Sequence, residues 1–219
     1  AKCSDKLRCL MEMCHYGTPP QSQVCVPCSD SPQKLMLICL CGMSAQDMSV
    51  RDMYGMFIRA SEFNRDVSLW DTSSVTSMRY MFRGSSKFNA DLSLWDVSSV
   101  ISMEFMFYKA SEFNQDVSLW DTSSVTIMQH MLDRASNSNA DLSLLDVSSV
   151  RDMQFIFYEA SEFNQDLNSW EQDMDAMFLE ASEFNGDVSL WDVSLVVSMF
   201  HMFDGATSFN TTLSLWDTS

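Results

Sequence analysis

The chain has 219 residues, of which 13 are basic and 30 acidic, and its formal net charge is −17 at pH 7. This charge excludes nucleic-acid binding through a basic surface, because phosphate recognition needs clustered Lys and Arg, and it favours cations and basic partners. With 46% apolar residues the chain can bury a substantial core. Its longest apolar run, Leu35–Cys41, is too short to cross a bilayer, so we expect no transmembrane segment in this chain.

Residues 1–43 form a cysteine-rich segment that contains all seven cysteines of the chain: Cys3, Cys9, Cys14, Cys25, Cys28, Cys39 and Cys41. Dense cysteine in a short stretch with Pro and Gly predicts a disulfide-stapled cap and an oxidising compartment. The odd number leaves one thiol free or paired outside the chain. The alternative is zinc, held by the Cys25-x-x-Cys28 and Cys39-x-Cys41 pairs, although the short second spacing is atypical of zinc sites.

Residues 44–219 consist of seven copies of a unit of about 25 residues. The consensus is V-x-x-M-x-x-M-F-x-x-A-S-x-F-N-x-D-[VL]-S-L-W-D-[VT]-S-S. One unit is shortened to 21 residues, because four residues are missing between Trp170 and Met174. A single unit of this size cannot bury its own apolar face, whereas stacked copies can, so the repeat predicts a solenoid.

Each unit has two halves with different periodicity. The V-x-x-M-x-x-M-F half places apolar residues on one face of a short helix or helical turn. The Asp-[Val/Leu]-Ser-Leu-Trp half alternates with period two, as a short strand does, and Asp-[Val/Thr]-Ser-Ser supplies turn and cap residues. The pattern therefore predicts an α/β repeat solenoid with short strands on one face and short helices or turns on the other.

The consensus closely resembles the BspA-like, leucine-rich-repeat-type surface proteins over about residues 44–219. Their 25-residue unit reads F-N-x-D-[IL]-S-x-W-D-V-S-x-V-x-x-M-x-x-M-F-x-x-A. The resemblance implies a right-handed leucine-rich-repeat-like coil with parallel strands on one face, and a place on the cell surface. The shortened unit and the unit at 128–150 depart from the family pattern, and the cysteine-rich segment lies outside it.

Equivalent residues of a solenoid stack in rows, so functional residues are sought row by row. The Met, Phe and Trp rows have the spacing of core residues. An asparagine row is complete in all seven units, and we expect it to form a buried ladder in which each amide bonds to the backbone of the next coil. This row comprises Asn64, Asn89, Asn114, Asn139, Asn164, Asn185 and Asn210.

Two acidic rows follow the asparagine row. Stacked carboxylates repel one another, so each needs either hydrogen bonds from a turn, which it would cap, or a bridging cation. We expect capping, with calcium between adjacent coils as the alternative. The first row, which is the candidate calcium site, comprises Asp66, Asp91, Asp116, Asp141, Asp166 and Asp187. The second comprises Asp71, Asp96, Asp121, Asp146, Glu171, Asp192 and Asp217.

A leucine row precedes the tryptophan row, at a position that is usually polar in the resembled family. It comprises Leu69, Leu94, Leu119, Leu144, Leu190 and Leu215, with Ser169 in the shortened unit. If these side chains point outward, they form a continuous apolar stripe that marks a docking surface for a partner. The alternative is that Leu points inward and Trp lies at the edge of the core.

Catalytic motifs are missing from the sequence, and every polar feature recurs from unit to unit, so we expect no enzyme activity and no resident cofactor other than the calcium alternative. His130 and His201 share a row three units apart, at roughly 15 Å, which is too far to share a metal or a proton.

The unit at 128–150 has Leu132, Ser138 and Leu145 where other units have Phe, Phe and Trp. Large-to-small core changes are costly, so we expect the lowest hydrogen-exchange protection there.

The function predicted from these features is that of a non-enzymatic extracellular or cell-surface protein, acting as a protein-binding or self-assembling structural module. The alternatives are an adhesion or recognition ectodomain for a soluble protein or glycan, with or without calcium, and a location in an organelle lumen.

Overall fold

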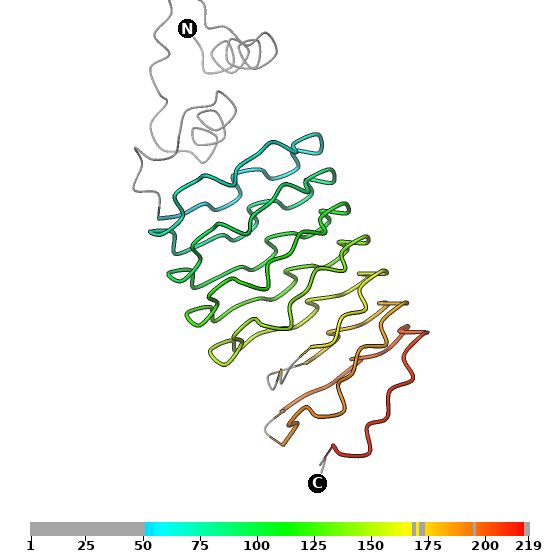
Figure 1. The fold of residues 1–219 in the computed structure, drawn as a ribbon. Coiled ribbons are helices and arrows are strands. Elements are labelled where there is room, and N and C mark those ends of the chain that lie inside the picture. The colour runs from blue at the N-terminus through cyan, green and yellow to red at the C-terminus, as the bar shows by residue number, and fades with distance from the viewer. Residues whose placement is uncertain (1–50, 168–169, 171–173, 195, 217–219) are drawn as a thin grey trace, which may run out of the picture. The chain divides into compact units, whose positions relative to one another are not determined.

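The computed structural model describes residues 51–167, 170, 174–194 and 196–216. These residues belong to one compact unit, Val50–Ser219. The repeats follow one another side by side along this unit, from cyan at residue 51 to red near residue 216 (Figure 1). We number the repeats as units 1 to 7, which begin at residues 51, 76, 101, 126, 151, 172 and 197. The predicted disulfide-stapled cap and its seven cysteines lie outside the described residues.

Turns, rather than helices and strands, build each unit in the described residues, where no α-helix is present. Pairing between units takes the form of four isolated parallel bridges, Asp52↔Ser77, Ser77↔Ser102, Ser102↔Ile127 and Ile127↔Asp152. These bridges lie in the half that was predicted to be helical. The half that was predicted to be a strand instead forms a turn around each Ser-Leu pair.

Backbone hydrogen bonds join successive units in the methionine-rich half. Alternate N–H groups of unit 1 donate to alternate carbonyls of unit 2: Met53 N–H to Ser77 O at 2.9 Å, and Phe57 N–H to Met81 O at 2.8 Å. The pattern continues through units 3 to 7, for example from Ala176 N–H to Phe200 O at 2.8 Å. This repeated bonding fixes the register, so that equivalent residues of neighbouring units lie opposite one another.

The same half also bonds to itself through consecutive four-residue turns. In unit 1, Met56 N–H donates to Met53 O and Ala60 N–H to Phe57 O. The third residue of each turn, Gly55 or Arg59, has a positive φ, as a type II turn requires. These turns explain why the M-x-x-M spacing resembles a helix: both structures bring residues three apart close together.

Positive φ recurs at both positions in every unit, mostly in residues other than glycine. The first row has φ between 52° and 61° and comprises Gly55, Tyr80, Phe105, His130, Phe155, Ala176 and His201. The second has φ between 52° and 73° and comprises Arg59, Gly84, Lys109, Arg134, Glu159, Glu180 and Gly205. A side chain in this conformation costs of the order of 1 kcal/mol, and the hydrogen bonds between units hold it in place.

The predicted Met, Phe and Trp rows form the core, which confirms that prediction. Within unit 1, the Phe57 and Phe63 rings stack at 3.9 Å between centroids. Both rings continue into stacks with the next unit, where Phe57 lies 5.3 Å from Phe82. Full burial of a phenylalanine side chain stabilises the fold by about 1.5–3 kcal/mol, so each of these repeated rings contributes to the driving force for stacking.

The asparagine row forms the predicted ladder: in each of six steps, the side-chain oxygen of one Asn accepts the backbone N–H of the next, at 2.7–2.9 Å. The expectation that the row is buried was wrong, because five of its members are exposed and Asn89 and Asn139 are half-buried. Tryptophan makes a second side-chain link, since Trp95 Nε1 donates to Val67 O at 2.9 Å. These side-chain links add to one direct backbone bond between units in this half, such as that from Lys87 N–H to Ser61 O at 3.1 Å.

Unit spacing widens from one side of the stack to the other. The distance between equivalent rings of neighbouring units is 4.3–4.9 Å in the row of Tyr80 and 5.3–5.7 Å in the row of Phe57. It grows to 5.9–6.2 Å in the row of Phe63 and to 6.2–6.5 Å in the row of Trp70. Each unit is therefore a wedge, with a narrow side at the bridges and a wide side at the tryptophans.

Candidate functional site

The leucine row lies on the wide side, at the tips of tight turns. In unit 1, Trp70 N–H donates to Val67 O at 3.1 Å, which closes a turn with Ser68 and Leu69 at its centre. The Asp66 carboxylate accepts the Ser68 N–H at 2.9 Å and fixes the start of this turn. Val67 is buried, and the turn therefore directs Leu69 outward while its neighbour packs in the core.

All six leucines of the row are exposed, with 64–79% of each residue accessible to solvent. The structure thus favours the outward alternative of the sequence interpretation. In unit 4, two leucines that lie two residues apart differ in burial: Leu142 is 1% exposed and belongs to the core, whereas Leu144 is 64% exposed and belongs to the leucine row. The exposed leucines occupy the same turn position in successive units. They therefore form a row and are not scattered singly over the surface.

Both acidic rows cap turns in the described residues. In the first row, Ser N–H groups donate to the Oδ1 atoms of Asp66, Asp91, Asp116, Asp141 and Asp187 at 2.8–2.9 Å. In the second, they donate to Asp71, Asp96, Asp121, Asp146 and Asp192 at 3.0–3.2 Å. Asp166, whose own turn lies outside the described residues, accepts the Asp187 N–H at 2.8 Å. The capping interpretation therefore accounts for the geometry of both rows.

Capping hydrogen bonds favour the ionised form of several of these aspartates. The hydroxyl and N–H of Ser68 lower the pKa of Asp66, and those of Ser73 lower the pKa of Asp71. Calcium binding by the first row remains a hypothesis. Within the described ranges, no three His, Cys, Asp or Glu side chains form a group that could hold a metal ion.

The narrow side carries a row of rings that varies in identity from unit to unit. Tyr80, Phe105, His130 and Phe155 stack successively at 4.9, 4.3 and 4.8 Å between centroids. All four are half-buried, because each ring covers the face of the next. His130 and His201 each pair with an aspartate of their own unit.

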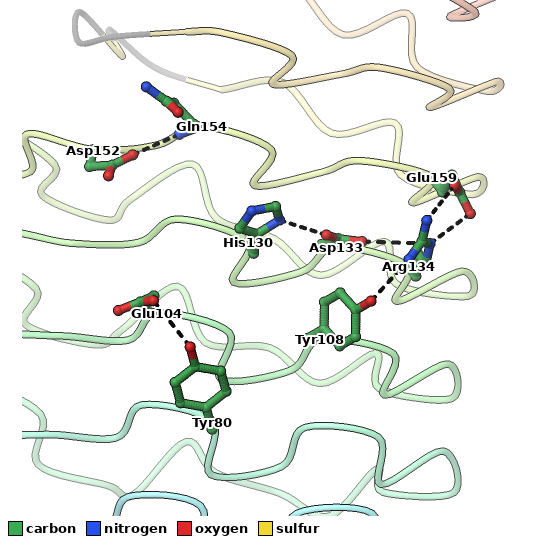
Figure 2. Close-up of polar contacts among 9 residues, drawn as sticks. All are labelled: Tyr80, Glu104, Tyr108, His130, Asp133, Arg134, Asp152, Gln154 and Glu159. Atoms are coloured by element: carbon green, nitrogen blue, oxygen red, sulfur yellow. Dashed lines mark hydrogen bonds and ion pairs between the residues drawn. The ribbon is translucent and has the colours of Figure 1, made fainter.

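A charged cluster lies beside this stack (Figure 2). Arg134 binds both carboxylate oxygens of Glu159, at 2.9 and 3.0 Å, and donates to the Tyr108 hydroxyl at 2.9 Å. These bonds link units 3, 4 and 5. Arg134 lowers the pKa of Glu159 through these hydrogen bonds, so the pair stays charged.

Asp133 is the one strongly buried carboxylate of this cluster, with 2% of its side chain exposed. Its Oδ2 lies 2.6 Å from His130 Nδ1, while its Oδ1 has no hydrogen-bond partner among the described residues. Burial raises the pKa of Asp133, against the opposing effect of His130. This pair was not predicted from the sequence, where its signal is the His-x-x-Asp spacing that unit 7 repeats as His201 and Asp204.

Unit 4 interrupts the aromatic core as the sequence predicted. Ser138 occupies the phenylalanine position between Phe113 and Phe163, is 0% exposed, and its hydroxyl has no hydrogen-bond partner among the described residues. Backbone bonds on both sides of the unit persist, including Asn137 N–H to Ser111 O and Leu132 N–H to Ile156 O, each at 3.0 Å. Unit 4 therefore stays in register with its neighbours, although Ser138 fills less of the core than a phenylalanine would.

No described helix is long and apolar enough to cross a membrane. The family model described as "Mycoplasma protein of unknown function, DUF285" matches residues 43–143, 91–172 and 171–219, so its matches together span the repeat region. No curated protein and no solved structure matches the chain significantly. The chain belongs to the family described as Mycoplasma protein of unknown function, DUF285.

Proposed function

We propose that the chain is a non-enzymatic, BspA-like surface protein whose leucine row binds another protein. In this proposal the repeats form a right-handed, leucine-rich-repeat-like solenoid, and the solenoid presents the row outside the cell. Membership of the DUF285 family supports a surface repeat protein. The hydrogen bonds that repeat from unit to unit support the solenoid.

The observation that carries the proposal is the exposure of the six leucines in register, at 64–79%. Exposed large apolar side chains are unfavourable in water unless a partner covers them, and contiguous exposed apolar patches mark interaction sites. The charged and polar residues on either side of the row resemble the polar rim around the apolar centre of an interface.

Three substitutions test this function: Leu94→Ser, Leu119→Ser and Leu144→Ser in one variant. Serine already occupies the row in unit 5, at position 169. The wild type and the variant are immobilised, and the proteins that each captures from cell-surface extracts are quantified. A variant with Ile101→Ser and Val197→Ser is the matched control, because these residues are 50% and 93% exposed and lie outside the row.

The proposal predicts at least one protein that the wild type and the control capture and the leucine variant loses. Identical captured sets for all three proteins would contradict a binding role for the row. The surface location is tested separately: an antibody against the repeats should label intact cells, and labelling only after permeabilisation would place the protein in an internal compartment such as an organelle lumen.

A further inference from the structure

The spacing of the leucine row restricts which partner can follow it. Leu69 directly precedes Trp70, and the tryptophans of neighbouring units lie 6.2 and 6.5 Å apart on the wide side. Alternate residues of an extended strand are separated by about 6.4–6.8 Å, which matches this spacing. A helix presents its apolar face once per turn, about every 5.4 Å.

The difference accumulates along the row. One turn of a helix is about 1 Å shorter than the spacing between units. Over the three steps from Leu69 to Leu144 the mismatch reaches about 3 Å, which is half the spacing of one unit. An extended segment stays closer to register over the same distance, because its spacing differs from that of the tryptophans beside the row by a few tenths of an ångström. A second copy of the chain also matches, since its leucine row has the same period.

Charge distinguishes the extended segment from the second copy. Five of the six leucines lie three residues after one capped aspartate and two residues before another, as Leu69 does between Asp66 and Asp71; Leu215 instead follows Thr212. These aspartates are exposed, so the leucine row is flanked by two rows of negative charge. Two copies facing each other would bring these rows together, at a cost of roughly 0.8 kcal/mol for each pair of charges 5 Å apart in water, and more near a protein surface.

Resting on the proposed function, we propose that the leucine row binds an extended, basic polypeptide segment in which apolar residues alternate with Lys or Arg. The apolar side chains of the segment pack between the leucines of successive units. Lysine and arginine have long apolar stems that can bend back toward the flanking carboxylates. The segment runs along the stack, across the turn tips of units 1 to 4.

The test uses three peptides of about nine residues, a length that spans four leucines. The first alternates Val and Lys. The second has the same composition in the order that gives helical spacing, and the third replaces every Lys of the first with Glu. Binding of each to the whole chain is measured by fluorescence anisotropy, for the wild type, the triple Leu→Ser variant, and the Ile101→Ser and Val197→Ser control.

We expect the alternating basic peptide to bind the wild type and the control at least about tenfold more tightly than either other peptide, a difference of 1.4 kcal/mol. The Leu→Ser variant should lose this preference. Raising the salt concentration to about 1 M, where charges are screened beyond about 3 Å, should weaken binding.

Three results would overturn the inference. Equal or tighter binding of the helical-order peptide would exclude the extended register. Equal binding of the acidic peptide would exclude the charge argument. Leucine-dependent dimerisation of the chain, seen by sedimentation, would assign the row to a second copy. In the first two cases the row itself would still bind, so the proposed function would survive; binding that ignores the Leu→Ser changes would remove both.

Discussion

The side-chain oxygen of Asn64 accepts the backbone N–H of Asn89 at 2.8 Å, and this bond between units recurs along the whole described stack. The amide acts as a spacer on the wider part of the wedge, where side-chain links supplement the backbone bond between units. A short polar side chain at this position therefore helps to set the spacing of units, and so the spacing of the leucine row.

Asn114→Ala should destabilise the fold by about 1–3 kcal/mol, because the N–H of Asn139 loses its acceptor. Chemical denaturation measures the free energy of unfolding. Asn210→Ala is the matched control, because Asn210 contributes its backbone N–H to the ladder, and the substitution retains that group. Equal stability of Asn114→Ala and the wild type would show that the ladder does not hold the units together.

Ser138→Phe should stabilise unit 4 by about 1–2 kcal/mol, because the ring would stack between Phe113 and Phe163 and remove a buried hydroxyl without a partner. Hydrogen exchange followed by mass spectrometry measures the effect locally. In the wild type, residues 128–150 should be the least protected part of the stack, and the substitution should raise protection there. Uniform protection along the wild-type stack would be inconsistent with a weak fourth unit.

Asp133→Asn should change stability in a pH-dependent way. Burial raises the pKa of Asp133, so the folded state holds its proton to a higher pH than the unfolded state does. The stability that this protonation contributes is present below about pH 4, the unfolded pKa, and is lost as the pH rises through the folded pKa. Relative to the wild type, Asp133→Asn should therefore be more stable at pH 7, by about 1 kcal/mol, and should lose this advantage toward pH 4.

Asp204→Asn provides the control for Asp133, because Asp204 also pairs with a histidine three residues earlier, at 3.0 Å, but 60% of its side chain is exposed. Urea denaturation at a series of pH values compares the two variants with the wild type. A pH profile shared by both variants would mean that burial of Asp133 has no special role.

The repeat, its length, the core rows and the shortened unit were predictable from sequence because they depend on periodicity, which seven copies make unambiguous. The local structure of the two halves of each unit was not predictable in the same way. Residues three apart meet both in a helix and in consecutive turns, and only the positive φ of residues such as Tyr80 and Arg59 distinguishes the two. Bulky side chains rarely adopt this conformation, so propensity argues against it.

The direction of the leucine row was also undetermined by sequence. A period-two pattern places Val67 and Leu69 on the same face of a strand, whereas the turn separates them and exposes only Leu69. The hydrogen bonding of the asparagine ladder was predicted from the sequence, but its exposure to solvent was not. The sequence shows that an amide recurs in every unit, but it does not show how far apart the units lie at that point.

Removal of calcium should leave the thermal midpoint unchanged, because each capped aspartate of the first acidic row already receives hydrogen bonds within its own turn, as Asp66 does from Ser68. Differential scanning fluorimetry with EDTA and then with excess calcium measures this directly. A midpoint that falls with EDTA and recovers with calcium, but not with magnesium, would instead support an ion row between units.

The most direct test of the account is the solvent accessibility of the leucine row in the native protein, measured by hydroxyl-radical footprinting with mass spectrometry. Leu119 and Leu144 should be oxidised nearly as fast as in the unfolded chain, while Leu142, two residues from Leu144, should be strongly protected. This contrast should persist on dilution. Protection of Leu119 and Leu144 equal to that of Leu142 in the dilute monomer would contradict the outward-facing row on which the proposed function rests.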